Sequence, residues 1–270
     1  TFPGGKGGNQ AVGAGKLGGR VYMVGCVGND LEGKQLYSNL LENHVHMDGV
    51  LIHESVPSGK AYIDVDQNGE STIVVYQGAN RLLSVEQINR CRYLFQNARY
   101  CLLSLEIPEA IAEYTIKFCR RNDTQVILKP SAVEKIKEEL LKDIAYFVPN
   151  ENELHTFVPG RMSLEEKAQI LLDKGVENVI VTLGDVGSAY LGKEFLHCPS
   201  VSGIQAIDPT AAGDSYIGAL SGALAGREPV DEAMRRATHT AAITVSRMGA
   251  LPSLPTLAEV EVSLARRSVS

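Results

Sequence analysis

The sequence predicts an α/β fold built on a mostly parallel sheet. From about residue 100 onward, short apolar runs alternate with segments of helical periodicity. Strands that alternate with helices indicate a parallel sheet covered by helices on both faces. The chain has 270 residues, of which 44% are hydrophobic and 21% charged, so it can bury a large core. No linker or internal repeat divides it, and we expect one domain over residues 1–270.

The expected elements follow in chain order. Residues 19–28 read as a buried strand, and residues 31–45 carry leucines at helical spacing. Residues 57–78 alternate polar and apolar side chains around Asn68-Gly69, which is typical of a β-hairpin inserted into the domain. The later strands are expected at 100–106, 124–129, 145–150 and 178–184, with a second hairpin at 187–198. The later helices are expected from Pro108, over 132–143, from Glu151, over 163–175, from about Asp214, over 230–247 and over 257–267.

Charge and cysteine content narrow the class of protein. The net charge is −6 and no basic stripe stands out, which argues against a nucleic-acid partner and favours small molecules. The five cysteines are scattered and form no C-x-x-C pair, a pattern that favours reduced thiols over disulfides or a zinc site. No apolar run approaches the roughly 20 residues that cross a bilayer, and no signal peptide is visible. We therefore expect a cytoplasmic protein without a membrane partner.

Three glycine patterns resemble phosphate loops but lack the context that such loops need. Gly13 to Gly18 match G-x-G-x-x-G, yet they precede the first strand in a segment that itself looks helical. Two further segments, 28–34 and 187–193, match G-x-x-x-x-G-K. Gln35 and Glu194 follow them where a magnesium-binding Ser or Thr is required. Nucleotide binding must therefore use neither a Rossmann fingerprint nor a Walker loop.

The stretch "DPTAAGDSYIGAL" places Asp214 at the start of a helix rich in small residues. A helix N-terminus offers unpaired N–H groups and a partial positive charge, and Ala211, Ala212 and Gly213 leave that backbone open to an anion. A carboxylate beside such a site can take a proton from an attacking hydroxyl. The alternative is structural: Asp is a common helix cap, and small residues pack helices closely.

The stretch "VPNENEL" places Asn150 and Glu153 three residues apart after a strand. Such a pair can face hydrated Mg²⁺, which takes few protein ligands and keeps several waters. It can equally be a capping box, with Asn150 as the cap.

The stretch "PGGKGGNQ" surrounds Lys6 and Asn9 with glycines. Such a loop can enclose a polyol, with Lys6 and Asn9 bonding its hydroxyls. The alternative is a flexible terminus.

Together these stretches resemble the ribokinase-like (PfkB-type) sugar kinases. "GGKGGNQAVGAGKLGG" is similar to the N-terminal signature of that family, and "DPTAAGDSYIGAL" is similar to its C-terminal signature. "YQGAN", "VPNENEL", "VTLGDVG" and "RMGALPSLP" follow the family's order, so the resemblance runs over nearly the whole chain.

The resemblance implies a three-layer αβα fold with a small β lid that includes the hairpin at 57–78. It implies transfer of the γ-phosphate of ATP to a sugar hydroxymethyl group, with D-ribose phosphorylated on its 5-hydroxymethyl group as the expected reaction. It also implies Mg²⁺, an activating K⁺ and a homodimer formed through the lid. The implied site residues are Asp214 as base and sugar contact; the backbone of Ala212 and Gly213 as anion hole; Gly5, Lys6, Asn9 and Glu106 around the sugar; Asn150 and Glu153 at Mg–ATP; Thr182 and Gly184 at the nucleotide; and Asp208, Thr210, Gly249 and Ser253 at a monovalent cation.

Some features depart from the family pattern. The family's first strand, with its Asp-bearing sugar motif, would lie before Thr1. Pro209 stands where a Thr is usual, and Lys129 where an Asn is usual. Other hypotheses are a kinase for another sugar or a nucleoside, an inactive sugar-binding protein on the same scaffold, and a Rossmann oxidoreductase. The intact "AAGD" argues against the binding protein, because a binder needs no base.

Overall fold

The computed structural model describes residues 3–65, 71–131 and 136–265. Its α-helices are α1 (Lys6–Lys16), α2 (Leu31–Glu42), α3 (Val85–Arg90), α4 (Arg92–Asn97), α5 (Glu109–Arg121), α6 (Glu151–Phe157), α7 (Leu164–Asp173), α8 (Ala212–Ala225), α9 (Val230–Val245) and α10 (Leu257–Ala265). Its strands are β1 (Val21–Gly28), β2 (Val45–His53), β3 (Lys60–Val65), β4 (Ser71–Tyr76), β5 (Tyr100–Ser104), β6 (Gln125–Lys129), β7 (Tyr146–Phe147), β8 (Asn178–Thr182), β9 (Gly187–Leu191) and β10 (Phe195–Pro199). Short 3-10 helices are η1 (Gly78–Leu82), η2 (Glu138–Asp143), η3 (Gly184–Val186) and η4 (Leu251–Ser253).

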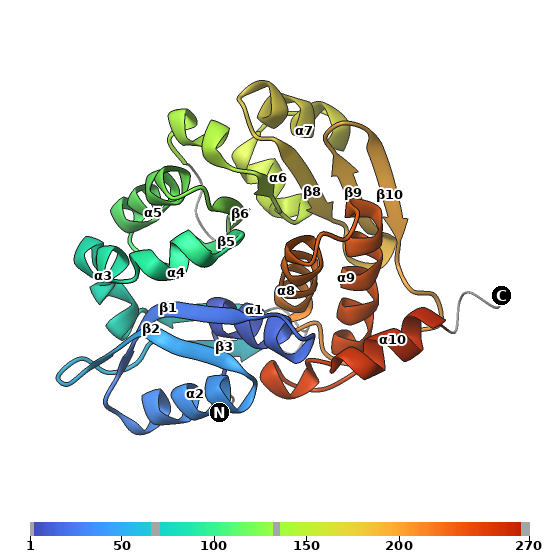
Figure 1. Ribbon diagram of the computed structural model, residues 1–270. Coiled ribbons are helices and arrows are strands. Elements are labelled where there is room, and N and C mark those ends of the chain that lie inside the picture. The colour runs from blue at the N-terminus through green and yellow to red at the C-terminus, as the bar shows by residue number, and fades with distance from the viewer. Residues whose placement is uncertain (1–2, 66–70, 132–135, 266–270) are drawn as a thin grey trace.

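The main sheet has six strands in the order β10-β9-β8-β7-β6-β5 (Figure 1). Strands β5 to β8 are parallel, and β9 and β10 add an antiparallel hairpin at one edge. The sheet is therefore mostly parallel, as the alternation of strands and helices predicts. Parallel neighbours also bring the carboxyl ends of four strands to one edge, where α/β proteins bind ligands.

Helices cover both faces of this sheet, which gives three layers. Successive strand residues point to opposite faces, and the core divides accordingly. In β6, Val126 and Leu128 pack into the core shared with α5 and α7, whereas Ile127 packs into the core shared with α8 and α9. In β8, Val181 likewise packs into the first of these cores and Ile180 into the second. Among the described helices, none is both long and apolar enough to span a bilayer.

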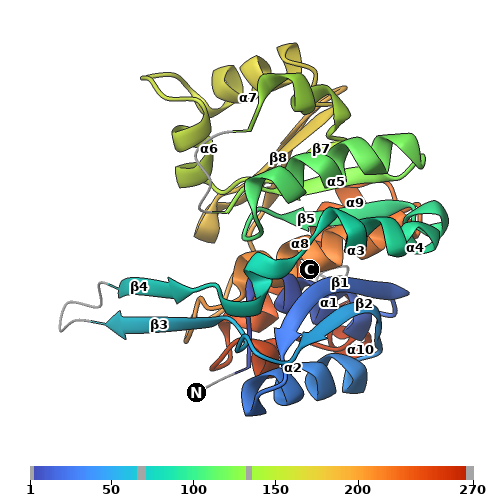
Figure 2. The same ribbon diagram turned by 90° about the vertical axis from the view of Figure 1, so that its left-hand side faces the viewer.

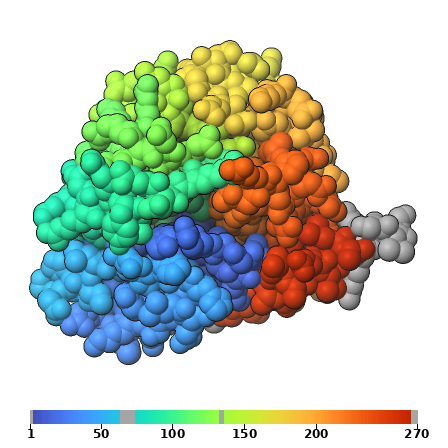
Figure 3. All heavy atoms as spheres, viewed as in Figure 1, coloured from blue at the N-terminus to red at the C-terminus, as the bar shows by residue number. Residues whose placement is uncertain are grey.

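A second, two-stranded parallel sheet pairs β1 with β2 and packs on α1 and α2. Within the described residues it is not hydrogen-bonded to the six-stranded sheet. On the face shown in Figure 3, a recess lies where the blue N-terminal, teal and orange segments meet. Strand β2 was not predicted from the sequence.

Strands β3 and β4 form the predicted hairpin, paired from Lys60–Tyr76 to Val65–Ser71. The turn at Asn68-Gly69 lies outside the described residues. Figure 2 shows the hairpin projecting from the body of the molecule. It exposes Tyr62, Val74 and Tyr76.

Two predictions about local structure were wrong. The described part of residues 132–143 contains no α-helix but the 3-10 helix η2, whose Leu140 and Leu141 are both buried just before the chain enters β7. A six-residue segment is too short to gain much from α-helical propagation, so packing decides its conformation. The expected strand at 145–150 is reduced to Tyr146–Phe147, and α3 and α4 were not anticipated.

Candidate active site

The predicted site residues gather at the carboxyl edge of the main sheet. β5 is followed by Glu106, β6 ends at Lys129, β7 is followed by Asn150, and β8 ends at Thr182. Asn150 and Thr182 are bridge partners, so two residues expected at the nucleotide lie side by side. The N-terminal turns of α1 and α8 meet here, and Asp214 joins them.

Asp214 lies in the first turn of α8 with a side chain that is nearly buried, at 8% exposure. Asn9 Nδ2 donates to its Oδ2 and Gln10 Nε2 donates to its Oδ1, each at 2.9 Å. Burial raises the pKa of Asp214, although both amide bonds and the charge of Lys6 act in the opposite direction. The carboxylate bonds side chains of α1 and does not cap its own helix, so the capping interpretation is wrong.

The backbone ahead of Asp214 forms the expected opening. Ala211 precedes α8 in the left-handed region, at φ 62°, and turns the chain sharply into the helix. An added Cβ at Gly213 would meet nothing within 4 Å. The Ala212 N–H donates to Pro209 O at 3.2 Å, whereas the N–H groups of Gly213 and Asp214 have no acceptor among the described residues. The N–H groups of Gly213 and Asp214 are therefore available to a ligand, whereas the N–H of Ala212, which was also expected to face an anion, is already bonded to Pro209 O.

The described part of the glycine-rich segment leads directly into helix α1, and side-chain bonds from Lys6 and Asn9 fix it to the rest of the site. Gly5 precedes α1 at φ 101°, which favours glycine. Lys6 Nζ donates to Glu106 Oε1 at 2.8 Å. Burial acts to lower the pKa of Lys6, but Glu106, Asp214 and Glu153 together raise it above its usual value.

Asn9 leaves one buried polar atom unsatisfied. Its Nδ2 bonds Asp214, but its Oδ1 is buried and has no hydrogen-bond partner among the described residues. A buried acceptor without a donor costs free energy, so a ligand hydroxyl at this point would stabilise the site. The acceptor lies on the same amide that orients the Asp214 carboxylate.

Asn150 and Glu153 form a capping box at the start of α6. Asn150 Oδ1 accepts the Glu153 N–H, and Glu153 Oε2 accepts the Asn150 N–H, both at 2.7 Å. The capping interpretation is thus confirmed. It leaves Glu153 Oε1 without a hydrogen-bond partner among the described residues.

Gly184, which was expected at the nucleotide, begins η3 at φ 61° with open space around it.

Asp208 joins two loops of the expected cation site. Its Oδ1 accepts the Thr210 N–H at 2.9 Å, and its Oδ2 accepts the Gly249 N–H at 2.8 Å. The Thr210 hydroxyl, followed by these two N–H bonds, holds the pKa of Asp208 below its ordinary value. Ser253 is buried at the end of η4, close in sequence to Gly249. Three of the four expected residues are therefore directly bonded together.

The comparisons with known proteins agree with this geometry. Residues 1–257 match the model of the pfkB family carbohydrate kinases. The chain belongs to the pfkB family of carbohydrate kinases. It is 33% identical to the ribokinase of Schizosaccharomyces pombe, over 97% of this chain and 86% of that protein. It is 32% identical to the deoxyribokinase of Salmonella typhi, over 94% of this chain and 85% of that protein. The structure of Arabidopsis thaliana ribokinase complexed with ribose and ATP matches with a TM-score of 0.89 and 29% identity, over 97% of this chain and 87% of that one.

Sequence reasoning missed one direct partner of Asp214 in this pfkB kinase and left another residue unexplained. Gln10 is almost fully buried and bonds Asp214, although only its neighbour Asn9 was expected at the site, as a sugar contact. Lys129 was noted only as a departure, yet its Nζ donates to Glu153 Oε2 at 2.5 Å. A long polar residue at the end of a parallel strand was the available signal for Lys129.

The phosphate-loop look-alikes take other roles in the kinase. Gly13 and Gly15 lie inside α1, where an added Cβ at Gly15 would come within 2.5 Å of Asn43 O. Asp30 caps α2 by accepting the Gly33 N–H. The second Walker-like segment is strand β9 and its turn. Close packing, capping and pairing explain all three patterns.

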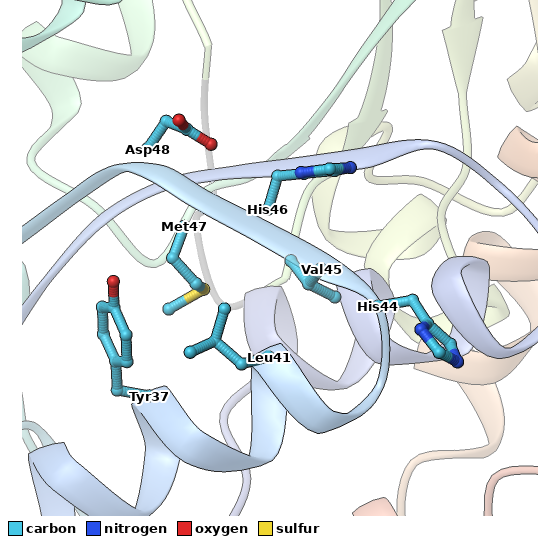
Figure 4. A pocket seen from close by; sticks show the side chains of 7 residues that line it. All are labelled: Tyr37, Leu41, His44, Val45, His46, Met47 and Asp48. Carbon is cyan, nitrogen blue, oxygen red and sulfur yellow. The ribbon is translucent and has the colours of Figure 1, made fainter.

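A separate hollow of about 460 Å³ lies beside α2 and β2, lined by Tyr37, Leu41, His44, Val45, His46, Met47 and Asp48 (Figure 4). In the close-up, Tyr37, Leu41 and Met47 lie between helix and strand, and Asp48 lies on the other side of the strand. None of the predicted site residues lines this hollow, so the active site is assigned to the edge of the main sheet.

Proposed function

We propose that this carbohydrate kinase transfers the γ-phosphate of ATP to the 5-hydroxymethyl group of D-ribose. The observation that carries the proposal is the Asn9–Asp214 pair. One amide holds a buried carboxylate and presents an unsatisfied acceptor beside it. A polyol can supply one hydroxyl to the acceptor and a second to the carboxylate. A related ribokinase whose structure contains ribose and ATP supports this choice of substrates.

Asp214 acts as general base. It accepts the proton of the attacking hydroxyl while Asn9 and Gln10 fix both carboxylate oxygens. The free N–H groups of Gly213 and Asp214, at the positive end of α8, stabilise negative charge on the transferred group. Lys6 and Glu106, joined by their ion pair, border the sugar.

The nucleotide side fits ATP with Mg²⁺. ATP is the phosphoryl donor, and a bound Mg²⁺ would draw charge from its phosphate oxygens. Glu153 Oε1 and the Asn150 side chain offer oxygen acceptors for the water molecules that a bound Mg²⁺ would keep. Thr182 lies beside Asn150, and Gly184 has no side chain to obstruct a nucleotide.

The remaining features of the proposal follow from the family resemblance. A K⁺ ion binds among Asp208, Thr210, Gly249 and Ser253, where the Asp208 carboxylate has lone pairs beyond its two N–H bonds. The protein forms a homodimer through β3 and β4, which expose apolar side chains. It is cytoplasmic, in keeping with scattered cysteines that form no C-x-x-C pair.

A coupled assay of ADP release tests the function. D-Ribose, 2-deoxy-D-ribose, D-fructose and a nucleoside are each supplied with ATP and Mg²⁺, with and without K⁺. We expect the highest kcat/KM with D-ribose and stimulation by K⁺. A higher kcat/KM for 2-deoxy-D-ribose would show that deoxyribose, and not ribose, is the preferred substrate, and the protein would then act like its deoxyribokinase relative. Sugar binding without sugar-dependent ADP release would instead favour the inactive binding protein.

A further inference from the structure

Lys129 is a buried lysine at the edge of the site. It ends β6, and its side chain is only 7% exposed. Its Nζ donates to Glu153 Oε2, the oxygen that also accepts the Asn150 N–H at 2.7 Å. Burying an ammonium group is costly unless a counter-charge and hydrogen bonds compensate. Glu153 supplies the counter-charge, but a lysine is not needed to build the capping box.

The charges around Lys129 are those of the predicted active site. Burial lowers the pKa of Lys129, and the charge of Lys6 acts in the same direction, while Glu153 and Asp214 oppose them. The cluster holds two lysines, Lys6 and Lys129, against the three carboxylates of Glu106, Glu153 and Asp214. Its formal charge is therefore −1, and without Lys129 it would be −2. Such a site repels a polyphosphate unless positive charge is placed on the phosphate side.

The hydrogen bonds of Lys129 are incomplete. An ammonium group has three donors. Glu153 takes one of them, and no other acceptor for Nζ is present among the described residues. Phosphate oxygens are strong acceptors for such donors, and charge-assisted bonds to them are about twice as strong as neutral ones.

We propose that Lys129 is a phosphate-binding residue, which contacts the phosphate chain of ATP on the Asn150–Glu153 side and offsets the charge of the neighbouring carboxylates. The proposal rests on the proposed use of ATP. Glu153 is then shared: Oε2 holds the ammonium group, and Oε1 faces the metal side. Because the charge of Lys129 is part of the chain, it assists ATP binding even when no metal is present.

Calorimetric titration of ATP into the protein, in EDTA and without sugar, tests this directly. We expect Lys129→Met to weaken ATP binding about tenfold, which corresponds to about 1.4 kcal/mol. Adenosine, which has no phosphate, should bind both proteins within twofold. Lys117→Met is the matched control. Lys117 lies on α5, and its replacement removes one positive charge from an exposed ion pair with Glu139 of η2, which should leave ATP binding unchanged.

A purely structural role for Lys129 is separated by a double variant. Lys129→Met alone leaves the Glu153 carboxylate without its partner, so Glu153→Gln and the double variant are titrated as well, with thermal melting to confirm folding. We expect the double variant to bind ATP about tenfold more weakly than Glu153→Gln. Equal ATP affinity of these two proteins, or equal losses for ATP and adenosine, would show that Lys129 only holds Glu153. A wild-type protein that binds no ATP in the presence of Mg²⁺ would overturn the proposed function itself.

Discussion

The contact between α1 and α8 holds Asp214, the proposed base, against its partners on α1, and a substitution at one glycine tests this contact. A Cβ added at Gly218 would lie 2.7 Å from Gln10 O and 3.1 Å from Ala14 N, both backbone atoms of α1. Distances this short force the two helices apart, because neither neighbour can rotate away. Gln10 bonds Asp214, so the same displacement disturbs the base.

Gly222 provides the matched comparison on the same helix. An added Cβ there meets nothing within 4 Å. Overpacking a tight contact costs about 1–3 kcal/mol, and the helical gain of alanine over glycine, about 0.5–1 kcal/mol, offsets part of it, so Gly218→Ala should lower the free energy of unfolding by up to about 2.5 kcal/mol. Replacing an unhindered helical glycine by alanine gains about 0.5–1 kcal/mol. Gly222→Ala should therefore be slightly more stable than the wild type, and because both variants make this gain, they should differ by the overpacking cost of about 1–3 kcal/mol.

Urea denaturation followed by circular dichroism measures both free energies, and the ADP-release assay measures kcat. We expect Gly218→Ala to lose both stability and kcat, whereas Gly222→Ala keeps its kcat. Identical unfolding midpoints for the two variants would refute the reasoning, since the helices would then not be in backbone contact at Gly218. Normal kcat in a destabilised Gly218→Ala would show that the position of Asp214 does not depend on this contact.

Other predictions concern the charged groups of the site. Asp214→Asn should lower kcat by at least about 100-fold, the lower range for a general base, while calorimetry shows unchanged ATP and sugar binding; near-normal turnover would contradict the assignment. Because burial raises the pKa of Asp214 and only the ionised carboxylate accepts a proton, kcat/KM should fall as the pH drops through a value above that of an ordinary aspartate. Gln10→Leu removes a donor that favours the ionised form, so this acid limb should move to higher pH; an unmoved limb would mean that another group titrates. Asp208→Ala removes the bonds to Thr210 and Gly249 and should abolish the stimulation of ADP release by K⁺, measured with Na⁺ as the control ion. Equal stimulation of the variant and the wild type by K⁺ would contradict this prediction.

The sequence was most informative where one pattern dictates local structure. The Asn150–Glu153 spacing indicated a capping box as one of two interpretations, and the alternation around Asn68-Gly69 predicted the β3–β4 hairpin. Strand β2 could not be predicted because it contains Asp48-Gly49, a pair typical of turns. Gly49 is needed because β1 and β2 approach each other closely at this point. An added Cβ would lie 2.7 Å from Met23 O, beside the shift in the β1–β2 register.

Partners that are distant in sequence could not be predicted in the same way. Gln10 and Asp214 are 204 residues apart, and no local pattern relates them. The small residues of α8 were expected to allow close packing on the sheet, and Gly218 in fact approaches the backbone of α1. Lys129 could be seen as unusual, but its bond to Glu153 depends on the order of strands in the sheet.

The choice of partners for Asp214 has a chemical consequence. A lysine or arginine bonded to the carboxylate would hold its pKa low and weaken it as a proton acceptor. Amide donors from Asn9 and Gln10 fix the same two oxygens without cancelling their charge, and burial then raises the pKa. The nearby lysines are paired elsewhere, Lys6 with Glu106 and Lys129 with Glu153. The site thus keeps positive charge within electrostatic range of the base while leaving the base free to take a proton.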